Sequence, residues 1–451
     1  MKRRLTAAET LSVSSMLFGL FFGAGNLIFP AYMGQAAGRN MLPALLGFLI
    51  SGVGLPLLAV AALATTHSDG LQDLSSKVGR GYSYFFTCAL YLTIGPFFAI
   101  PRCFTVPFET GVAPIVPAGV PPRLALFLFS LVFFALMLFF SLRPGKILMW
   151  VGKLLNPLFL LVFAWIMVTA LLRPLGSVAA AEPAADYLAA PLAKGILEGY
   201  NTMDALAGLA FGIVVVNVIT SLGVGDPGDV AACTVRSGAL ACILMAVIYA
   251  VTVVVGAQSR GAYGVAENGG AALAAIARHY FPGAGAYLFA AMIFFACLKT
   301  AVGLITSCSE TFEKMFPNTL SYRKWVVLFS VASLAFANIG LTGIIQLSLP
   351  VLMMLYPLAM TLIILALTEK YFHAEPLVYR LVTAFALVCA CVDFLGALPA
   401  GARAALRLDG VVGFFTRVLP FASIGLGWVC PAVLAFCLAL LLSRGKKRKN
   451  G

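Results

Sequence analysis

The sequence predicts an all-α polytopic membrane protein with about 12 transmembrane helices, each about 20 residues long. Of the 451 residues, 61% are hydrophobic and only 10% are charged, which is far from the balance of a soluble domain. Apolar runs of roughly 18 to 28 residues recur along the chain, and a helix of that length crosses a hydrocarbon core about 30 Å thick. The connections between the runs are short. We therefore expect a single transmembrane domain over residues 1–451.

The apolar runs define the predicted spans in order. They cover residues 10–33, 41–65, 82–110, 123–142, 147–172, 195–221, 229–257, 284–312, 323–339, 342–368, 378–399 and 419–443. The first run is interrupted by glycines, has no small-residue cleavage site and is followed at once by the second run. It is therefore predicted to be a retained helix and not a signal peptide. Between the seventh and eighth runs, residues 271–280 are predicted to form a short helix.

The charge of the chain fits a membrane topology better than a nucleic-acid partner. The net charge is +13, but Lys and Arg lie mostly between the apolar runs or at their ends and do not gather on one polar face. With both termini on one side, that side carries roughly twice as many Lys and Arg as the other, so both termini are predicted to be cytoplasmic. The lipid bilayer is the expected surrounding, with no nucleic acid and no obligatory protein partner.

Composition and motifs argue against an enzyme. The chain shows no cluster of nucleophile, acid and base, no phosphate-binding loop followed by Lys, and ten cysteines without metal-ligand spacing. No cofactor is expected. Without a nucleotide-binding segment, uphill movement of a solute would be driven by an ion gradient or by a partner subunit.

The first apolar run contains Gly23, Ala24, Gly25 and Asn26, with Pro30 one turn later. A backbone in hydrocarbon must satisfy its own N–H and C=O groups, so an unwound segment is tolerated only where it faces protein, water or a solute. Small residues spaced in this way also permit close packing of helices, which is the competing interpretation. The mid-membrane amide of Asn26 needs a partner, and this favours a break that forms a binding site.

The sixth run contains Gly208 and Gly212 on either side of three apolar residues, and this pattern predicts a second break five runs after the first. Two repeats of five helices, at about 10–172 and 195–368, each opening with a broken helix, are typical of an inverted-repeat transporter. Helices at about 378–443 are then additions to the repeats. An odd number of helices per repeat inserts the second repeat upside down relative to the first.

Asp204 is an acidic residue inside a predicted span, and two interpretations stay open for it. Inside the membrane an acid is costly and implies a function, through a counter-charge, an ion or a substrate amine. If the span begins near Leu206, Asp204 instead lies at the interface in the first turn of a helix, where the helix dipole favours a negative charge.

The third run carries Arg102 and Glu109 among three prolines, Pro96, Pro101 and Pro107, which predict a kinked helix. The two charges are seven residues apart and share a helix face, so they are expected to pair directly or through water in the outer half of the membrane. Either this salt bridge only allows both charges to be buried, or the pair belongs to an outer vestibule or gate.

The eighth run contains Lys299 next to Thr300. The Thr300 hydroxyl either ligates Na+ or bonds back to a carbonyl of its own helix, and the spacing does not decide between these. A buried ammonium must pair, lose its proton or reach water. Lys299 therefore joins Asp204, Arg102 and Glu109 as a candidate for coupling or gating.

Five segments carry a resemblance to a known family. They are residues 21–30 (FFGAGNLIFP), 95–102 (GPFFAIPR), 202–204 (TMD), 211–212 (FG) and 300–304 (TAVGL). Together they resemble the bacterial branched-chain amino acid carriers, the leucine, isoleucine and valine:cation symporter family, over essentially the full chain. That family looks related to amino acid symporters of the LeuT-type fold, whose first and sixth helices unwind around substrate and sodium. The resemblance implies a secondary active transporter that imports branched-chain L-amino acids with Na+ across the bacterial cytoplasmic membrane.

The resemblance also implies roles for residues of the two breaks. The N–H groups of Gly23, Ala24 and Gly25 would bind the substrate carboxylate. The side-chain oxygen of Asn26 would ligate a first Na+, and the substrate carboxylate would complete the shell of that ion. Phe211 would pack on the aliphatic side chain of the substrate.

Further carbonyls are implicated in the same way. Those from Gly208 and Leu209 onward would accept the substrate ammonium. A second Na+ site would be made of three backbone carbonyls and one hydroxyl, those of Gly19, Phe22, Ala296 and Thr300. Lys299 departs from the LeuT-type pattern, which has a hydroxyl at this position, so its ammonium would either replace the second Na+ or point away from it.

Alternatives to this function stay open. A transporter of the same fold could couple to H+, work without Na+, or carry an aromatic amino acid or a purine. An ion channel or facilitator would be expected to show repeated filter segments or rings of charge supplied by several subunits. Here the two interruptions differ in sequence and lie in one chain.

Overall fold

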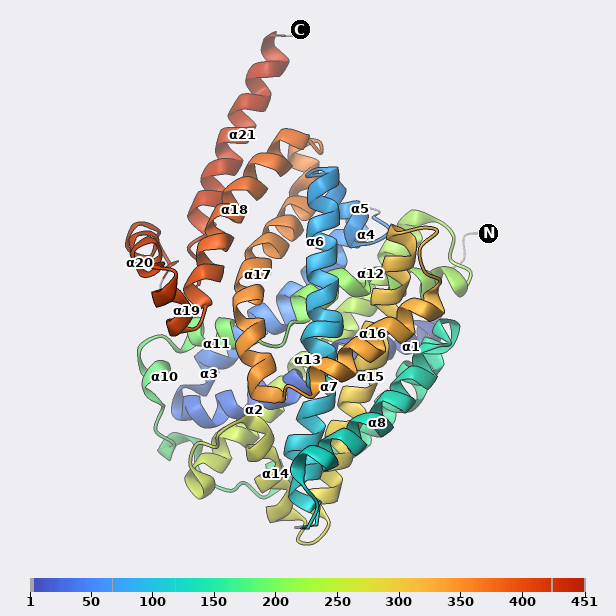
Figure 1. Cartoon of the computed structure of the whole chain (residues 1–451), viewed down its shortest axis with the longest axis vertical. Helices are drawn as coiled ribbons and strands as arrows, with labels where there is room; N and C mark the ends of the chain where they lie inside the picture. Colours follow the sequence, from blue (N-terminus) through green and yellow to red (C-terminus); the bar gives the residue numbers. More distant parts are fainter. Residues whose placement is uncertain (1–3, 67, 118, 423–424, 450–451) are drawn as a thin grey trace.

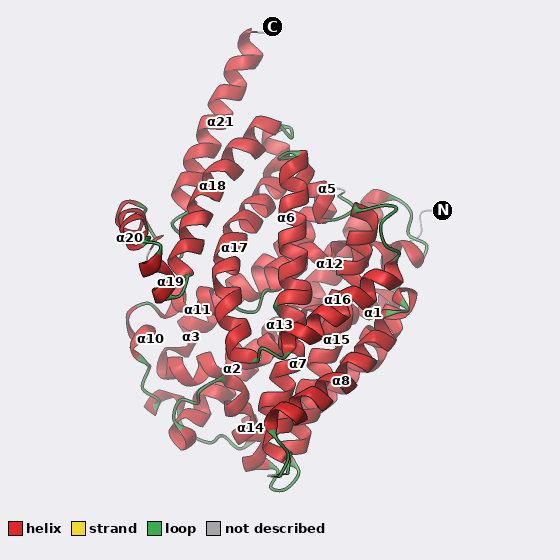
Figure 2. Ribbon diagram, viewed as in Figure 1, coloured by secondary structure: helices red, strands yellow, loops and turns green. Residues whose placement is uncertain are grey.

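The computed structural model describes residues 4–66, 68–117, 119–422 and 425–449. Within these ranges the chain consists of helices and loops without a β-strand (Figure 2). The long helices pack against one another, and the C-terminal helix extends beyond the others (Figure 1). The predicted all-α class is confirmed.

The first half of the chain forms five passes, some of them broken. Its helices are α1 (Ala7–Phe21), α2 (Ala24–Ala37), α3 (Met41–Leu49), α4 (Leu55–Thr65), α5 (Leu71–Ser76), α6 (Arg80–Leu92), α7 (Ala99–Val106), α8 (Pro122–Ser141) and α9 (Asn156–Leu172). Wider π-helical turns lie within three of these passes, at η2 (Ile50–Gly54), at η3 (Thr93–Phe97) and η4 (Pro107–Val112) in the same pass, and at η7 (Leu148–Leu155).

The second half repeats this order and then adds further helices. The helices are α10 (Ala185–Ala189), α11 (Pro191–Tyr200), α12 (Asp204–Ser221), α13 (Pro227–Tyr263), α14 (Gly269–Tyr280), α15 (Gly285–Met315), α16 (Tyr322–Ala337) and α17 (Leu341–Phe372). The additions are α18 (Pro376–Ala397), α19 (Ala400–Ala405), α20 (Asp409–Val418) and α21 (Val429–Lys449). The short helix predicted at residues 271–280 is confirmed as α14.

The membrane character of these helices follows from their length and composition. Among the described residues, nine helical segments are long and apolar enough to cross a membrane, and shorter apolar helices lie at Ala7–Phe21 and Val429–Ser443. Each predicted span coincides with a helix or with a broken pair of helices, which gives about 12 passes of membrane-crossing length. The bounds predicted for the two repeats stay a prediction.

The last span begins later than predicted. It was expected from residue 419, but α21 starts at Val429 and the preceding helix ends at Val418. Pro420 cannot continue a helix because it lacks an N–H, and Phe421 adopts a positive φ of 63°. The hydropathy of the sequence predicted an apolar span from residue 419, but it does not report the turn of the backbone at Pro420 and Phe421 that delays the final helix.

The two halves correspond in their connections as well as in their passes. A short helix follows the second pass of each half, α5 in the first and α14 in the second. In Figure 1, α5 lies in the upper part of the molecule and α14 near the bottom. Placing equivalent helices toward opposite ends is what an inverted repeat requires. Contacts between the halves are made by α2 with α13, α3 with α11 and α4 with α12.

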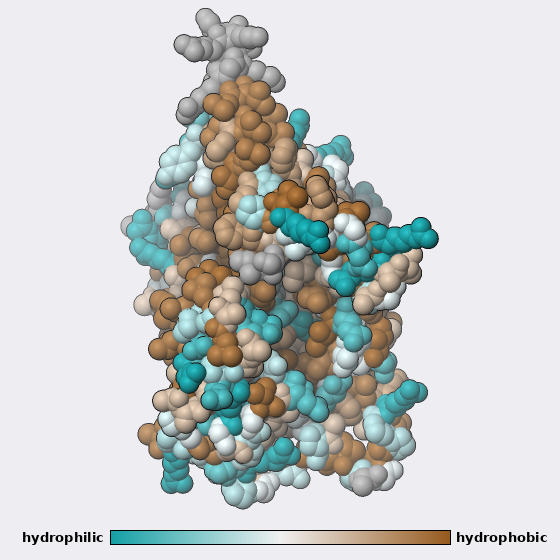
Figure 3. Space-filling model, turned by 90° about the vertical axis from the view of Figure 1, so that its left-hand side faces the viewer, coloured by the Kyte–Doolittle hydropathy of each residue, from teal (hydrophilic) through white to brown (hydrophobic). Residues whose placement is uncertain are grey.

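The outer surface is apolar over much of its area, as a lipid-facing surface must be. Large hydrophobic side chains are exposed on many of the helices, among them Leu172 at 77% and Leu441 at 67%. Figure 3 shows hydrophobic side chains along the upper part of the molecule below the C-terminal tip, and a greater mixture of hydrophilic ones toward the bottom.

Glycines allow α3 and α11 to cross in backbone contact. A Cβ atom at Gly195 would lie 2.0 Å from the carbonyl oxygen of Ala44, and one at Gly47 would lie 2.0 Å from that of Leu192. Each helix thus places a glycine against a carbonyl of the other. Small residues at such a crossing let two membrane helices approach closely enough for dispersion contacts to hold them together.

We expect Gly195→Ala to destabilise the protein by about 1–3 kcal/mol, because a backbone carbonyl cannot rotate away from the added methyl group. Thermal unfolding of the purified protein in detergent measures this change. Gly81→Ala is the matched control, since a Cβ atom at Gly81 meets nothing within 4 Å. Equal unfolding temperatures for the two variants would contradict the close crossing.

Candidate functional site

The first transmembrane pass unwinds at Phe22 and Gly23, between α1 and α2. Gly23 has an extended backbone, and its N–H donates to the side-chain oxygen of Asn26 at 2.9 Å. Residues 24–26 form the first turn of α2, where backbone N–H groups have no partner within the helix. The break predicted in this run is confirmed, and its glycine-rich segment forms the start of the second half-helix.

The second break lies earlier than predicted. The chain leaves the helix at residues 201–203, between α11 and α12, and Met203 adopts a left-handed backbone with φ of 65°. The predicted break at residues 208–212 is wrong, because α12 is continuous there. A Cβ atom at Gly208 would lie 2.9 Å from the Cβ of Ala59 in α4. Glycine is therefore needed at this position for close helix packing and not for unwinding.

This correction changes the role expected for Gly208 and Leu209. Both lie in the middle of α12 and are buried. Their carbonyls each accept a hydrogen bond from the N–H four residues on, so neither is freed by an unwound backbone as the prediction required. At the true break, the carbonyl of Asn201 accepts a hydrogen bond from the guanidinium of Arg102 at 3.1 Å.

Both interpretations left open for Asp204 hold: the residue is buried, and it lies in the first turn of a helix. It is the first residue of α12, where the positive end of the helix dipole favours a carboxylate, and it is only 1% exposed. Its Oδ2 atom accepts hydrogen bonds from the side-chain amide of Asn26 at 2.6 Å and from the hydroxyl of Tyr249 at 2.9 Å. The Asn26 amide also donates to the Tyr249 hydroxyl. One side chain from each break thus meets at a tyrosine of α13.

A small cavity lies beside this junction, with a volume of about 40 Å³. It is lined by many of the predicted site residues, namely Gly23, Ala24, Gly25, Asn26, Arg102, Asp204, Phe211 and Thr300. Its apolar wall includes Phe211, whose ring contacts that of Phe21 edge-on with centroids 5.6 Å apart. A volume of this size holds a few water molecules. The helices must therefore separate before a larger ligand can enter.

Arg102 faces this cavity and does not pair with Glu109. Its side chain is 6% exposed and lies over the ring of Phe29, 5.6 Å from the centroid. Glu109 instead accepts a hydrogen bond from the backbone N–H of Leu341 at 3.0 Å. The predicted salt bridge is wrong because Glu109 lies in the π-helical segment η4, whose wider turn removes the common face that a seven-residue spacing gives in an α-helix.

The residues expected at a second ion site lie next to the end of α1. The hydroxyl of Thr300 donates to the carbonyl of Gly19 at 3.3 Å, so it bonds to another helix and not to its own. Phe22 and Ala296 are buried in the same core. Lys299 points away from the central cavity, and its ammonium donates to the side-chain oxygen of Asn156 in α9 at 3.0 Å.

Two polar residues of the site were missed in the sequence. Tyr249 lies in the seventh span and Asn156 at the start of α9, both fully buried. The argument that drew attention to Asn26, that a mid-membrane amide needs a partner, applies equally to Asn156. Tyrosine gives a weaker signal, because a phenol at membrane depth is often only an amphipathic core residue.

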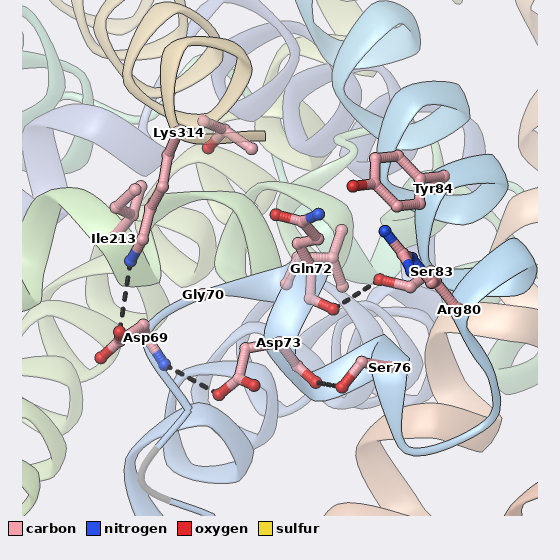
Figure 4. A pocket seen from close by; sticks show the side chains of 12 residues that line it. Asp69, Gly70, Gln72, Asp73, Ser76, Arg80, Ser83, Tyr84, Ile213 and Lys314 are labelled. Carbon is pink, nitrogen blue, oxygen red and sulfur yellow. Dashed lines mark hydrogen bonds and ion pairs between the residues drawn. The ribbon is translucent and has the colours of Figure 1, made fainter. Parts of the chain in front are cut away.

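A larger cavity of about 400 Å³ opens at the α5 side of the molecule (Figure 4). Lys314 at the end of α15 pairs with Asp69 before α5 at 3.2 Å, and the two side chains stand at one side of the cavity. Ile213 of α12 also lines it. Because α12 and α15 line the central cavity too, the two cavities share the same pair of helices.

Hydrogen bonds connect α12 with both α6 and α15 between the two cavities. The carbonyl of Ala210 accepts hydrogen bonds from the hydroxyl of Tyr91 at 2.8 Å and from that of Ser307 at 2.6 Å. Ala210 lies next to Phe211 of the central cavity and three residues before Ile213 of the larger one. The contact therefore lies between the two cavities along α12.

Comparisons with known proteins place the whole chain in one group. A family model described as branched-chain amino acid transport protein matches residues 6–446. A branched-chain amino acid permease, BrnQ, of Lactobacillus delbrueckii subsp. lactis is 60% identical over 451 residues, covering 99% of this chain and 100% of the relative. The branched-chain amino acid transport system 2 carrier protein of Pseudomonas aeruginosa is 40% identical over 447 residues, covering 99% of each chain. The permease BrnQ of Escherichia coli (strain K12) is 37% identical over 449 residues, covering 100% of this chain and 99% of the relative.

A solved structure shares the fold. Mhp1, a nucleobase-cation-symport-1 family transporter in a closed conformation with bromovinylhydantoin bound, superposes with a TM-score of 0.59 over 98% of this chain and 93% of its own. The sequence identity is 14%, so the likeness concerns the fold alone. It confirms the predicted LeuT-type arrangement of inverted repeats.

We expect Tyr249→Phe to destabilise the protein by about 1–2 kcal/mol, because Asp204 and Asn26 both lose a buried hydrogen-bond partner. Thermal unfolding in detergent measures the effect. Tyr82→Phe is the matched control, since the buried hydroxyl of Tyr82 has no hydrogen-bond partner among the described residues and its loss should be neutral or stabilising. A neutral Tyr249→Phe would show that this hydroxyl does not support the junction.

Proposed function

We propose that this chain, which belongs to the family of branched-chain amino acid transport proteins, imports leucine, isoleucine and valine by symport with Na+. As a multi-pass membrane transporter of that family it is not an enzyme. The observation that carries the proposal is the meeting of the two helix breaks at Asn26 and Asp204, beside a cavity with an apolar wall. We further propose that it lies in the bacterial cytoplasmic membrane with both termini in the cytoplasm.

The two ends of a zwitterionic amino acid find complementary partners around the central cavity. The N-terminal turn of α2 presents the N–H groups of Ala24 and Gly25, and the helix dipole adds partial positive charge there. The Arg102 guanidinium lies beside Gly25, where a Cβ atom would come within 3.2 Å of its Nη2 atom. These groups suit the carboxylate, and the Asp204 carboxylate suits the ammonium. The aliphatic side chain would lie against Phe211.

One Na+ is proposed beside the substrate carboxylate, with the side-chain oxygen of Asn26 as its ligand. In the structure that oxygen accepts from Gly23 N–H, while the amide nitrogen is held by Asp204 and Tyr249. The amide is thus fixed by both ends, and its oxygen faces the unwound backbone that cations use in broken membrane helices. Because substrate and ion would share a ligand shell, each would strengthen the binding of the other.

The apolar wall explains the substrate class and limits its selectivity. A one-methylene difference in such a pocket is worth only about 1–3 kcal/mol, so leucine, isoleucine and valine should compete with one another. A polar side chain would lose its hydrogen bonds against Phe211 and Leu304, which line the cavity.

Transport requires the central site to open alternately to each side of the membrane. We propose that the larger cavity at α5 is the cytoplasmic vestibule. In this state the hydrogen bonds of Tyr91 and Ser307 to the Ala210 carbonyl close the passage toward it. Separation of α12 from α6 and α15 would break both bonds and would join the two cavities.

The proposal is tested with purified protein in liposomes. Labelled leucine should accumulate when Na+ is higher outside, and unlabelled valine and isoleucine should compete while phenylalanine should not. Accumulation driven by a pH gradient without Na+ would assign H+ as the coupling ion. Passive equilibration under every gradient would identify a facilitator.

Asn26→Ala should raise the half-saturating concentrations of Na+ and leucine together, each about tenfold if the lost ligand is worth about 1.4 kcal/mol. The physical reason is that the substrate and Asn26 ligate the same ion. Uptake against varied Na+ and leucine concentrations measures both values. Asn338→Ala is the control, since Asn338 is exposed at the end of α16 and its amide donates to the carbonyl of Leu334 in that helix. A change in one constant without the other would remove Asn26 from the shared shell.

A further inference from the structure

Lys299 is a fully buried basic residue outside the substrate cavity. Its side chain is 0% exposed, and its ammonium donates to the Asn156 side-chain oxygen at 3.0 Å. Among the described residues, it forms no ion pair with a carboxylate. A buried ammonium without a counter-charge is costly in a membrane protein and requires another source of stabilisation.

Three aromatic rings supply that stabilisation. The ammonium lies 3.9 Å from the ring centroid of Phe159 in α9, 4.6 Å from that of Phe18 and 5.4 Å from that of Phe22 at the end of α1. Ring faces attract cations through their quadrupole, and the attraction is stronger away from water. The rings and the Asn156 oxygen together form a cation site that a side chain already fills.

This site is located at the C-terminal end of the first half-helix. The last carbonyls of a helix lack partners within it and carry partial negative charge. The last turn of α1 contains no basic residue of its own. The neighbouring residue of Lys299, Thr300, donates to the carbonyl of Gly19 in that turn. Asn156 packs against the same glycine, where an added Cβ atom would lie 3.6 Å from the Asn156 Cβ.

Two consecutive residues of α15 therefore interact with the C-terminal end of α1. Thr300 donates a hydrogen bond to it, and Lys299 places its ammonium beside it. We propose that the Lys299 ammonium is a built-in cation at this end of α1, in the place of a second transported ion, so that one free cation accompanies each amino acid. This inference rests on the proposed function. The carbonyls of Gly19, Phe22 and Ala296, expected to ligate a second Na+, would then lie near the Lys299 ammonium and would bind no second ion.

The wild-type protein provides the first test. Liposomes are loaded with defined Na+ gradients, and the fluxes of radiolabelled Na+ and leucine are measured in the same preparation. The expected ratio is about one Na+ per leucine, with a Hill coefficient for Na+ of about one. A ratio of about two would overturn the inference while leaving Na+ symport in place.

Lys299→Thr is the second test, because it removes the charge and places a hydroxyl beside that of Thr300. The Hill coefficient for Na+ should rise to about two, as a second ion takes the place of the ammonium. Lys299→Arg is the matched variant that keeps the charge, and its coefficient should stay at about one. A Lys299→Thr protein that transports with an unchanged coefficient would overturn the inference.

If Lys299→Thr does not transport, Na+ binding to the purified variant still tests the inference. Na+ should then raise the unfolding temperature of purified Lys299→Thr more steeply with concentration than that of the wild type, because binding to a folded state stabilises it. Equal Na+ dependence in the two proteins would contradict a vacated cation site. If the wild type itself shows no Na+-driven uptake, the proposed coupling ion is wrong. A Na+ requirement gained by Lys299→Thr would still support the role of the lysine.

Discussion

A backbone that leaves the helix inside a bilayer must find partners for its N–H and C=O groups within the protein, and this requirement organises the centre of the molecule. At the first break the Asn26 side chain binds the N–H of Gly23. At the second, the hydroxyl of Thr202 donates to the Gly199 carbonyl and that of Tyr356 to the Tyr200 carbonyl. The breaks stay open because side chains replace the hydrogen bonds that the helix gave up. The few backbone groups left without partners are then available to a ligand.

The same side chains connect the two halves of the molecule. Asn26 comes from the first pass and Asp204 from the sixth, and both are held by Tyr249 of the seventh. A buried polar network of this kind is stable only when all of its members are satisfied, so its geometry is strongly specified. Around it, glycines such as Gly195 and Gly208 let helices approach to backbone contact. The functional groups therefore stand on a closely packed frame, which is where precise positioning is best maintained.

The three buried charges near the centre are stabilised in different ways, and these differences suggest different roles. Asp204 is held by neutral donors at a helix N-terminus, Arg102 by a backbone carbonyl and an aromatic face, and Lys299 by three rings and an amide. The first two border the central cavity and can meet a zwitterion. Lys299 is separated from it and interacts with the protein itself. Arg102 and Asp204 are of opposite charge at the central cavity, which suits a ligand that carries both a carboxylate and an ammonium.

The sequence by itself determined the all-α membrane class, the approximate order of the spans, the break near Asn26 and the family. These features depend on local properties: the length of apolar runs, and short motifs that keep their order along the chain. Only the tertiary structure showed where the second break lies. In the sequence, Gly208 and Gly212 have the same pattern whether they unwind a helix or allow another helix to pack closely against it. The tertiary structure also decided that Glu109 does not pair with Arg102 and that Lys299 faces Asn156. Partners far apart in the chain are chosen by packing and by the need to satisfy every buried polar group, and neither constraint can be evaluated until the helices are assembled.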